Sequence, residues 1–154
     1  MKKLLIFALL LLALSPAARA EEKINSFDVT LQVQTDGSII VTEDISVFVE
    51  HYQIKRGIYR DIPQTRRSAV TPLSLSFDGE KHPYFTEKHA NALRINFGDD
   101  NYIPLGRHTY SFKYKVDNAV GQFKNYDEIY WNITGNYWDF NIEQATATVV
   151  LPQG

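Results

Sequence analysis

Residues 27–49 read FDVTLQVQTDGSIIVTEDISVFV, two runs of alternating apolar and polar residues separated by an Asp-Gly turn. Alternation with a period of two indicates a strand that is buried on one face and solvated on the other. Asp-Gly between two such runs is a strong hairpin signal, because glycine readily adopts the left-handed conformation that tight turns need. We therefore expect residues 27–49 to fold as an antiparallel hairpin and to begin a β-sheet.

The length of this turn decides which residues of the hairpin face the core. A two-residue loop at Asp36-Gly37 would set Val29 opposite Asp44 and place charge against the apolar face. A three-residue loop of residues 35–37, with Gly37 left-handed, instead pairs Val33 with Ile39, Leu31 with Val41 and Phe27 with Ile45. We choose the three-residue loop, which turns Glu43 inward, opposite Val29, as an isolated carboxylate in an aliphatic row.

Five further segments alternate in the same way and are bounded by turn residues: 72–77, 93–97, 109–116, 128–133 and 145–151. No segment shows a convincing helical period. Short strands at this spacing, without helical crossovers, predict an all-β fold, an antiparallel β-sandwich of seven to eight strands with immunoglobulin-like architecture. Tyr110 stands at the start of a long strand after Leu105-Gly106, so we expect its hydroxyl to bond loop backbone as a tyrosine corner does.

The first twenty residues have the pattern of a secretory signal peptide. Lys2 and Lys3 precede an apolar run over residues 4–14, and Ala18-Arg19-Ala20 is an A-x-A cleavage site. We therefore predict that residues 1–20 are removed and that residues 21–154 form one extracytoplasmic domain. The chain has no cysteine, so packing alone must hold this domain together, which suits a bacterial envelope protein.

The charge balance narrows the choice of partner. The chain has 16 basic and 18 acidic residues, and three of the basic ones (Lys2, Lys3 and Arg19) lie in the predicted signal peptide. The remaining acidic domain is a poor match for nucleic acid or an anionic membrane surface, so we expect no nucleic-acid partner. The four histidines are scattered and have no cysteine companion, so we predict no metal site and no cofactor.

Residues 55–63, KRGIYRDIP, hold the first candidate site residues. A carboxylate that faces a core needs a partner, and the planar guanidinium of arginine can satisfy both of its oxygens. We therefore predict an ion pair between Glu43 and either Arg56 or Arg60, with Glu128 as an alternative acceptor. The pair either fixes residues 55–63 on the sheet or leaves Arg60 free to bind an anionic ligand or partner.

A second set of candidates is aromatic: Phe123, Tyr126, Tyr130, Trp131, Tyr137, Trp138 and Phe140. These rings either belong to the core or form a platform for sugar rings or a protein interface. Tyr137 and Trp138 follow Gly135-Asn136, so we expect one of them to be exposed. The candidate binding residues are therefore Arg56, Tyr59, Arg60, Tyr137 and Trp138.

The sequence does not favour an enzyme. No serine lies in a glycine-flanked nucleophile elbow, and we predict no catalytic residue. Asp127 and Glu128 are adjacent on one predicted strand and so point to opposite faces. They cannot provide by themselves the two acids across a cleft that glycoside hydrolysis requires.

Seven motifs together resemble the N-terminal domain of the YciQ-like predicted membrane proteins, classed as domain of unknown function 2207. They are Asp36-Gly37-Ser38, Val41-Thr42-Glu43, residues 57–63, Thr109-Tyr110, residues 127–132, residues 134–138 and Val150-Leu151-Pro152. The resemblance runs from about Ile24 to Pro152. It implies an extracytoplasmic β domain that precedes transmembrane helices, with membrane anchoring through segments absent from this chain, and it transfers no reaction.

Together these features predict an interaction or sensing module of a membrane-anchored bacterial envelope protein, located in the periplasm or at the cell surface. Its partner would be an envelope protein or a glycan. The alternative is a carbohydrate-binding or carbohydrate-processing β-sandwich domain that uses the aromatic residues and nearby acids.

Overall fold

The computed structural model describes residues 22–98, 101–136 and 138–153, so the predicted signal peptide lies outside the described residues. The described residues form eleven strands and no helix, which confirms the all-β prediction. The strands are β1 Lys23–Val33, β2 Ile39–Val49, β3 Tyr59–Pro63, β4 Val70–Phe77, β5 Glu80–Lys81, β6 Tyr84–His89, β7 Ala92–Phe97, β8 Gly106–Val116, β9 Val120–Gln122, β10 Asp127–Ile129 and β11 Ala145–Val150.

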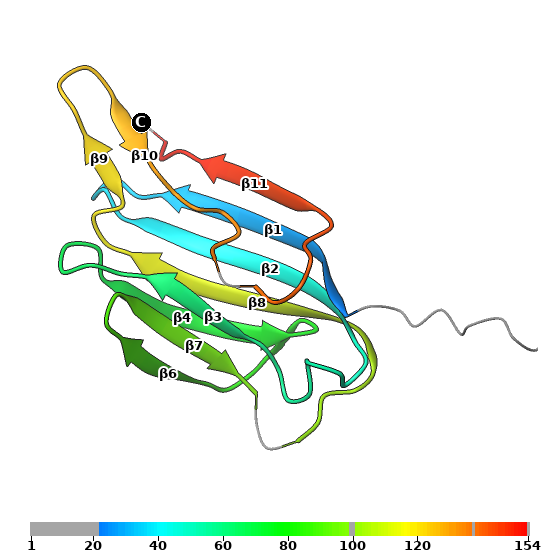
Figure 1. Cartoon of the computed structure of the whole chain (residues 1–154). Coiled ribbons are helices and arrows are strands. Elements are labelled where there is room, and N and C mark those ends of the chain that lie inside the picture. Colours follow the sequence, from blue (N-terminus) through cyan, green and yellow to red (C-terminus); the bar gives the residue numbers. More distant parts are fainter. Residues whose placement is uncertain (1–21, 99–100, 137, 154) are drawn as a thin grey trace, which may run out of the picture.

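Six strands form one long sheet in the order β11-β1-β2-β8-β4-β5 (Figure 1). The first hairpin, β1–β2, has the predicted register, with Val33 opposite Ile39 and Val29 opposite Glu43. Gly37 has a φ of 79°, as the three-residue turn requires. Because β2 lies between β1 and β8, this register places Glu43 in the interior of the sheet and far from either edge.

The long sheet is mixed, so the prediction of a purely antiparallel sheet is wrong in one place. β11 runs parallel to β1, with Phe27 opposite Ala145 and Gln32 opposite Val150. Alternation gives the two faces of a strand but says nothing of its direction. Here no hairpin joins the two strands, because almost the whole chain lies between them. The immunoglobulin-like arrangement is not confirmed by this topology.

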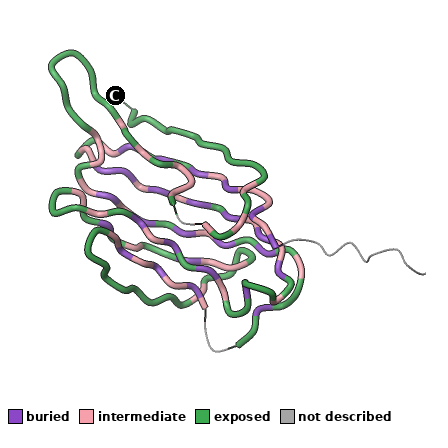
Figure 2. The backbone as a smooth tube through the Cα atoms, viewed as in Figure 1, coloured by how far each residue is buried: buried purple, intermediate pink, exposed green. Residues whose placement is uncertain are grey.

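One face of the long sheet is covered by two other parts of the chain. A three-stranded sheet, β3-β7-β6, contributes Ile62, Leu93 and Ile95 to the same buried cluster as β1, β2 and β8. Residues 129–142, which follow the short β9–β10 hairpin, add half-buried aromatic and aliphatic side chains to this cluster. The opposite face of the sheet is largely polar, and buried and exposed residues alternate along its strands (Figure 2).

Four strands were not predicted, and each lacks a usable alternation. β5 and β9 have two and three residues, too few to show a period. All six residues of β6 are exposed, so the strand has no apolar face. β3 has Arg60 as one of its two buried residues, and a charged residue does not mark an inward position in a sequence.

The tyrosine-corner prediction for Tyr110 is wrong. Its hydroxyl is buried and has no hydrogen-bond partner in the described structure. The ring lies instead in an aromatic cluster, with ring centres 5.1 Å from Phe77 and 4.6 Å from Phe97. Burial, together with the nearby charge of Asp78, raises the pKa of Tyr110 well above its ordinary value.

Glu22 fixes the loop that leads from β2 toward β3. Its carboxylate accepts hydrogen bonds from the amides of Glu50, Tyr52, Gln53 and Ile54, at 2.8, 3.2, 2.5 and 3.0 Å. Burial alone would raise the pKa of Glu22, but the four amide donors outweigh it and hold the pKa below the ordinary value of 4.5. The ionised carboxylate therefore stabilises this loop in the folded protein.

This contact predicts a stability difference that depends on pH. Since the folded pKa of Glu22 lies below 4.5, its contribution is complete above that value and is lost as the pH falls through the folded pKa. Glu22→Gln should lower the melting temperature at pH 7, and the gap to the wild type should narrow below pH 4.5. The control is Glu80→Gln on the exposed strand β5. A gap that persists unchanged to pH 3, or an equal gap for Glu80→Gln, would contradict this role.

Candidate functional site

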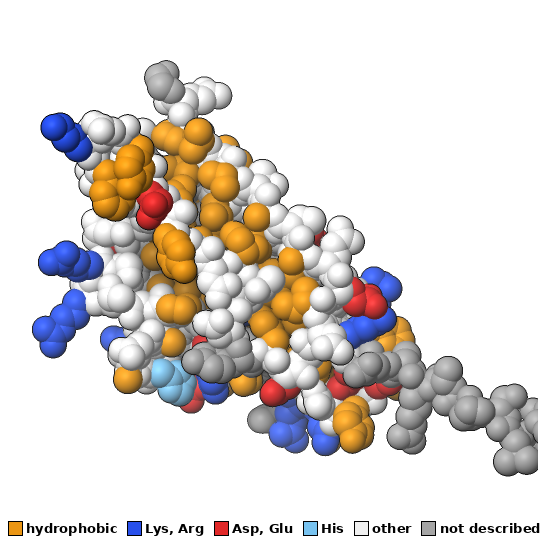
Figure 3. Space-filling model, turned by 45° about the horizontal axis from the view of Figure 1, so that its top comes forward, with side chains coloured by type: hydrophobic (Ala, Val, Ile, Leu, Met, Phe, Trp, Pro, Cys, Tyr) orange, Lys and Arg blue, Asp and Glu red, His pale blue; other side chains and the backbone are white. Residues whose placement is uncertain are grey.

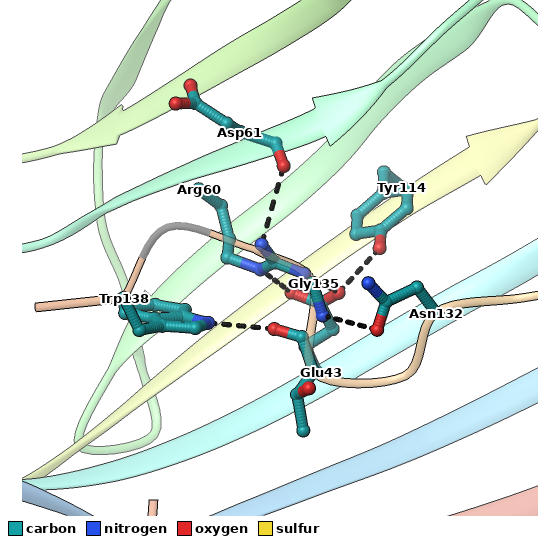
Figure 4. A network of polar contacts seen from close by, with 8 residues as sticks. Glu43, Arg60, Asp61, Tyr114, Asn132, Gly135 and Trp138 are labelled. Carbon is teal, nitrogen blue, oxygen red and sulfur yellow. Dashed lines mark hydrogen bonds and ion pairs between the residues drawn. The ribbon is translucent and has the colours of Figure 1, made fainter. Parts of the chain in front are cut away.

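The inward carboxylate of Glu43 is the centre of a buried polar network (Figure 4). Glu43 is completely buried in the middle of β2. Its Oε2 accepts a hydrogen bond of 2.6 Å from Nε of Arg60, and its Oε1 accepts one of 2.9 Å from Nη2 of the same side chain. The Tyr114 hydroxyl, on β8, donates a third bond of 2.6 Å to Oε1. Both carboxylate oxygens are therefore satisfied inside the core.

Arg60 reaches this carboxylate from β3 and is itself 3% exposed. Its Cζ lies 5.5 Å from the centre of the Phe27 ring and 5.4 Å from that of Trp138, so two aromatic rings flank the guanidinium. Burial acts to lower the pKa of Arg60, but the charge and hydrogen bonds of Glu43 outweigh it and raise the pKa. The ion pair joins the three-stranded sheet to the long one.

The third partner, Tyr114, is held in its neutral form. Burial raises the pKa of Tyr114 well above its ordinary value, and the neighbouring charge of Glu43 adds to this effect. A neutral phenol can donate its proton to the carboxylate, whereas a phenolate would repel it. Tyr114 thus acts as a fixed hydrogen-bond donor from a third strand.

Gly135 lies directly against the guanidinium of Arg60. It has a φ of 73°, and a Cβ added to it would lie 2.5 Å from Nη1 of Arg60 and 2.7 Å from Nη2. The turn that carries it is held by a bond of 3.2 Å from the Gly135 amide to Oδ1 of Asn132 and by one of 2.7 Å from Trp138 Nε1 to the Thr134 carbonyl. Glycine is required here both for the backbone conformation and for the close approach to the guanidinium.

The structure therefore separates the alternatives for the inward acid. It brings Glu43 and Arg60 together. Arg56 is exposed, and its Cζ lies 5.6 Å from the ring centre of Tyr102, while Glu128 is exposed on β10. Three donors of Arg60 are bound: Nε and Nη2 to the Glu43 carboxylate, and Nη1 to the Asp61 carbonyl at 3.4 Å. Arg60 therefore links β3 to β2.

A cavity of about 340 Å³ lies beside the network, between the residues before and within β3 and the turn over Arg60. Its lining consists of Gln53, Ile54, Gly57, Ile58, Tyr59, Arg60, Asp61, Asn136, Trp138, Asp139 and Phe140. Three of the candidate binding residues, Tyr59, Arg60 and Trp138, contribute to this lining. Arg56 lines a neighbouring hollow next to Phe97, to which Tyr59 also contributes, and Tyr137 lies outside the described residues.

The wall formed by Tyr59 is held rigidly. The guanidinium carbon of Arg94 lies 3.9 Å from the centre of the Tyr59 ring, and Arg94 makes two bonds of 2.7 Å to the Asp61 carboxylate. These hydrogen bonds from Arg94 hold the pKa of Asp61 below its ordinary value. One face of the Tyr59 ring is therefore covered by a cation.

The aromatic candidates divide into two groups. Trp131, Trp138 and Phe140 are half-buried against the core. Phe123 and Tyr126 stack on each other at 4.9 Å near the end of the β9–β10 hairpin, and each is more than half exposed. Tyr130, which is 91% exposed, follows the hairpin. In the sequence these residues were grouped by their aromatic character, and in the structure their distance from the core separates them.

The described residues contain no group of three histidine, aspartate or glutamate side chains that could hold a metal ion. The cavity is lined by apolar side chains of Ile54, Ile58 and Phe140 and by amide and carboxylate groups of Gln53, Asn136 and Asp139. Two members of the site, Tyr114 and Gly135, were missed in the sequence. Both are set by pairing between distant segments, for which the sequence contains no local signal.

The close contact of Gly135 gives a direct test of the cap over Arg60. Gly79 has a similar φ of 86°, but a Cβ added there would meet nothing within 4 Å. Gly79→Ala should therefore lower the free energy of unfolding only by the cost of the left-handed backbone, about 1–2 kcal/mol. Gly135→Ala should lower the free energy of unfolding by about 1–3 kcal/mol more than Gly79→Ala does, because the new methyl group must displace Arg60. Equal losses in chemical denaturation would show that the turn does not press on the guanidinium.

No helix in the part of the chain that the structure describes is long and apolar enough to cross a membrane. Comparison with solved structures finds weak likenesses to much larger proteins. Leukotriene A4 hydrolase from Saccharomyces cerevisiae is 12% identical with a TM-score of 0.46, over 62% of this chain and 15% of that one. An M1 zinc metallopeptidase from Deinococcus radiodurans is 10% identical with a TM-score of 0.43, over 64% of this chain and 21% of that one.

Comparison with known sequences is more informative. The uncharacterized protein YciQ of Escherichia coli strain K12 is 33% identical over 131 residues, which cover 79% of this chain and 21% of YciQ. This chain thus spans about a fifth of the length of its curated relative. Residues 23–154 match the family described as "Predicted membrane protein (DUF2207) N-terminal domain". The resemblance noted in the sequence is confirmed, and the chain belongs to the DUF2207 N-terminal domain family of predicted membrane proteins.

Proposed function

We propose that this chain is a non-catalytic recognition domain that a membrane protein displays outside the cytoplasm, and that it binds a protein partner of the cell envelope. The N-terminal targeting pattern and the lack of cysteine support the extracytoplasmic location. The family supports the link to a membrane. The partner and the side of the membrane are parts of the proposal.

The cavity beside Arg60 is the observation that carries this proposal. Its volume, about 340 Å³, falls at the lower end of the range of about 300–1,000 Å³ that is typical of binding pockets. Two of its lining residues, Arg60 and Asp61, are fixed by ion pairs with Glu43 and Arg94. A pocket of this size with both apolar and polar lining is suited to an anchor side chain of a protein partner.

A carbohydrate is the second candidate ligand. Tyr59 and Trp138 line the cavity together with Gln53, Asn136 and Asp139, and rings next to amides and carboxylates are the groups that contact sugars. Against this candidate, Arg94 covers one face of Tyr59 and Arg60 lies against Trp138. Each ring therefore has at most one face left for stacking on a sugar, so we favour the protein partner.

The test compares two exposed tyrosines of the three-stranded sheet. Tyr59 lines the cavity, and Tyr84, on β6 and of similar exposure, does not. Purified wild type, Tyr59→Ala and Tyr84→Ala should be used for affinity capture from envelope extracts and on a glycan array. We expect one set of captured proteins that is lost with Tyr59→Ala and kept with Tyr84→Ala. We expect no binding to any sugar of the glycan array.

Two outcomes would count against the proposal. Capture that survives Tyr59→Ala would exclude the cavity as the recognition site. Binding of a defined sugar that Tyr59→Ala abolishes would show that the cavity binds a carbohydrate and not a protein partner.

A further inference from the structure

β11 ends the long sheet with an unpaired backbone edge. Its inner edge bonds to β1 over six residue pairs, from Phe27 with Ala145 to Gln32 with Val150. No other strand of the described residues pairs with its outer edge. A row of free amide and carbonyl groups at such an edge is a template for another extended strand.

The inward face of β11 is also uncovered. Residues that are paired across two strands share a face, so Ala145, Ala147 and Val149 lie on the same side as Phe27, Val29 and Leu31 of β1. These three β1 residues are buried, whereas every residue of β11 is exposed (Figure 2). Val149 is 52% exposed and Leu151 is 69% exposed. Hydrophobic side chains gather on the surface where β11 and the β9–β10 hairpin lie (Figure 3).

The two edges of the long sheet differ in their protection against pairing. The opposite edge ends in β5, which has only two residues, Glu80 and Lys81, both charged. Short, charged edge strands are the usual means of preventing edge-to-edge association. Residues 145–151 read ATATVVL and contain no charged residue and no proline. The β11 edge thus lacks the charged residues that β5 places at the other end of the sheet, next to Ser76 and Phe77 of β4.

A second copy of this chain fits the β11 edge. Neither copy brings charge to the contact, so their acidic character does not oppose it there. In an antiparallel pair, directly opposed residues share a face. A two-fold axis through Thr148 would set Ala147 opposite Val149 of the second copy and Ala145 opposite Leu151 of the second copy. Small residues would then meet large ones along the whole inward strip.

We propose that β11 is a homodimer edge, through which two copies join their long sheets by antiparallel pairing about an axis at Thr148. The proposal is independent of the cavity beside Arg60, because the cavity lining includes no residue of β11. Such a dimer requires a specific register between the two β11 strands, and it requires that the edge carry no charge.

Cysteine cross-linking tests the register, because the chain has no cysteine of its own. The purified chain from residue 21 onward contains every described strand and can carry Thr148→Cys or the control Thr30→Cys. Thr30 pairs with Thr148 on β1 and faces the same way, one strand further from the edge. The two control positions would be about 14 Å apart across three strand spacings, beyond the reach of a disulfide. Mild oxidation should yield covalent dimer with Thr148→Cys and none with Thr30→Cys.

Sedimentation equilibrium tests the association itself. The wild-type mass should rise from monomer to dimer with concentration, while Val149→Lys should stay monomeric over the same range with an unchanged melting temperature. Glu80→Lys, at the other edge, should dimerise like the wild type. A wild type that is monomeric at every concentration, a dimer that survives Val149→Lys, or equal cross-linking of the two cysteine variants would overturn the proposal.

Discussion

A carboxylate in the middle of an aliphatic row is the constraint on which the rest of this structure depends. Glu43 is fully buried on β2, and an unpaired charge in such a place would cost several kcal/mol. Arg60 removes that cost by bringing β3 over the long sheet, and Tyr114 supplies a donor from β8. The position of the three-stranded sheet thus follows from one acidic residue in the first hairpin.

The same constraint shapes the candidate site. Because the guanidinium of Arg60 must be enclosed, the turn at Gly135 lies against it, and Trp138 packs over it. The cavity lies at the border of this turn, and its lining includes Arg60 and Trp138 from the network. Arg60 is thereby a buried residue of the cavity wall, and the proposed partner would contact Tyr59 and Asp139.

Local pattern was enough for the hairpin and for its register, since Asp36-Gly37 and the alternation around it leave a single arrangement that pairs the apolar rows of both strands, with Glu43 as the inward charge. It was also enough to expect a cation for Glu43. It could not choose between Arg56 and Arg60, because that choice depends on how β3 pairs with β7. The parallel direction of β11 and the roles of Tyr114 and Gly135 depend in the same way on contacts between distant segments, which alternation does not encode.

A double-mutant cycle on the buried pair tests the central claim most directly. Glu43→Met and Arg60→Met should each lower the free energy of unfolding by about 3–5 kcal/mol, since each leaves one uncompensated buried charge. The double variant removes both charges and should be no less stable than either single variant, which gives a large favourable coupling. Tyr114→Phe should cost about 1 kcal/mol as a reference for one lost hydrogen bond. Losses that simply add in the double variant would contradict the account, because the two side chains would then stabilise the fold independently.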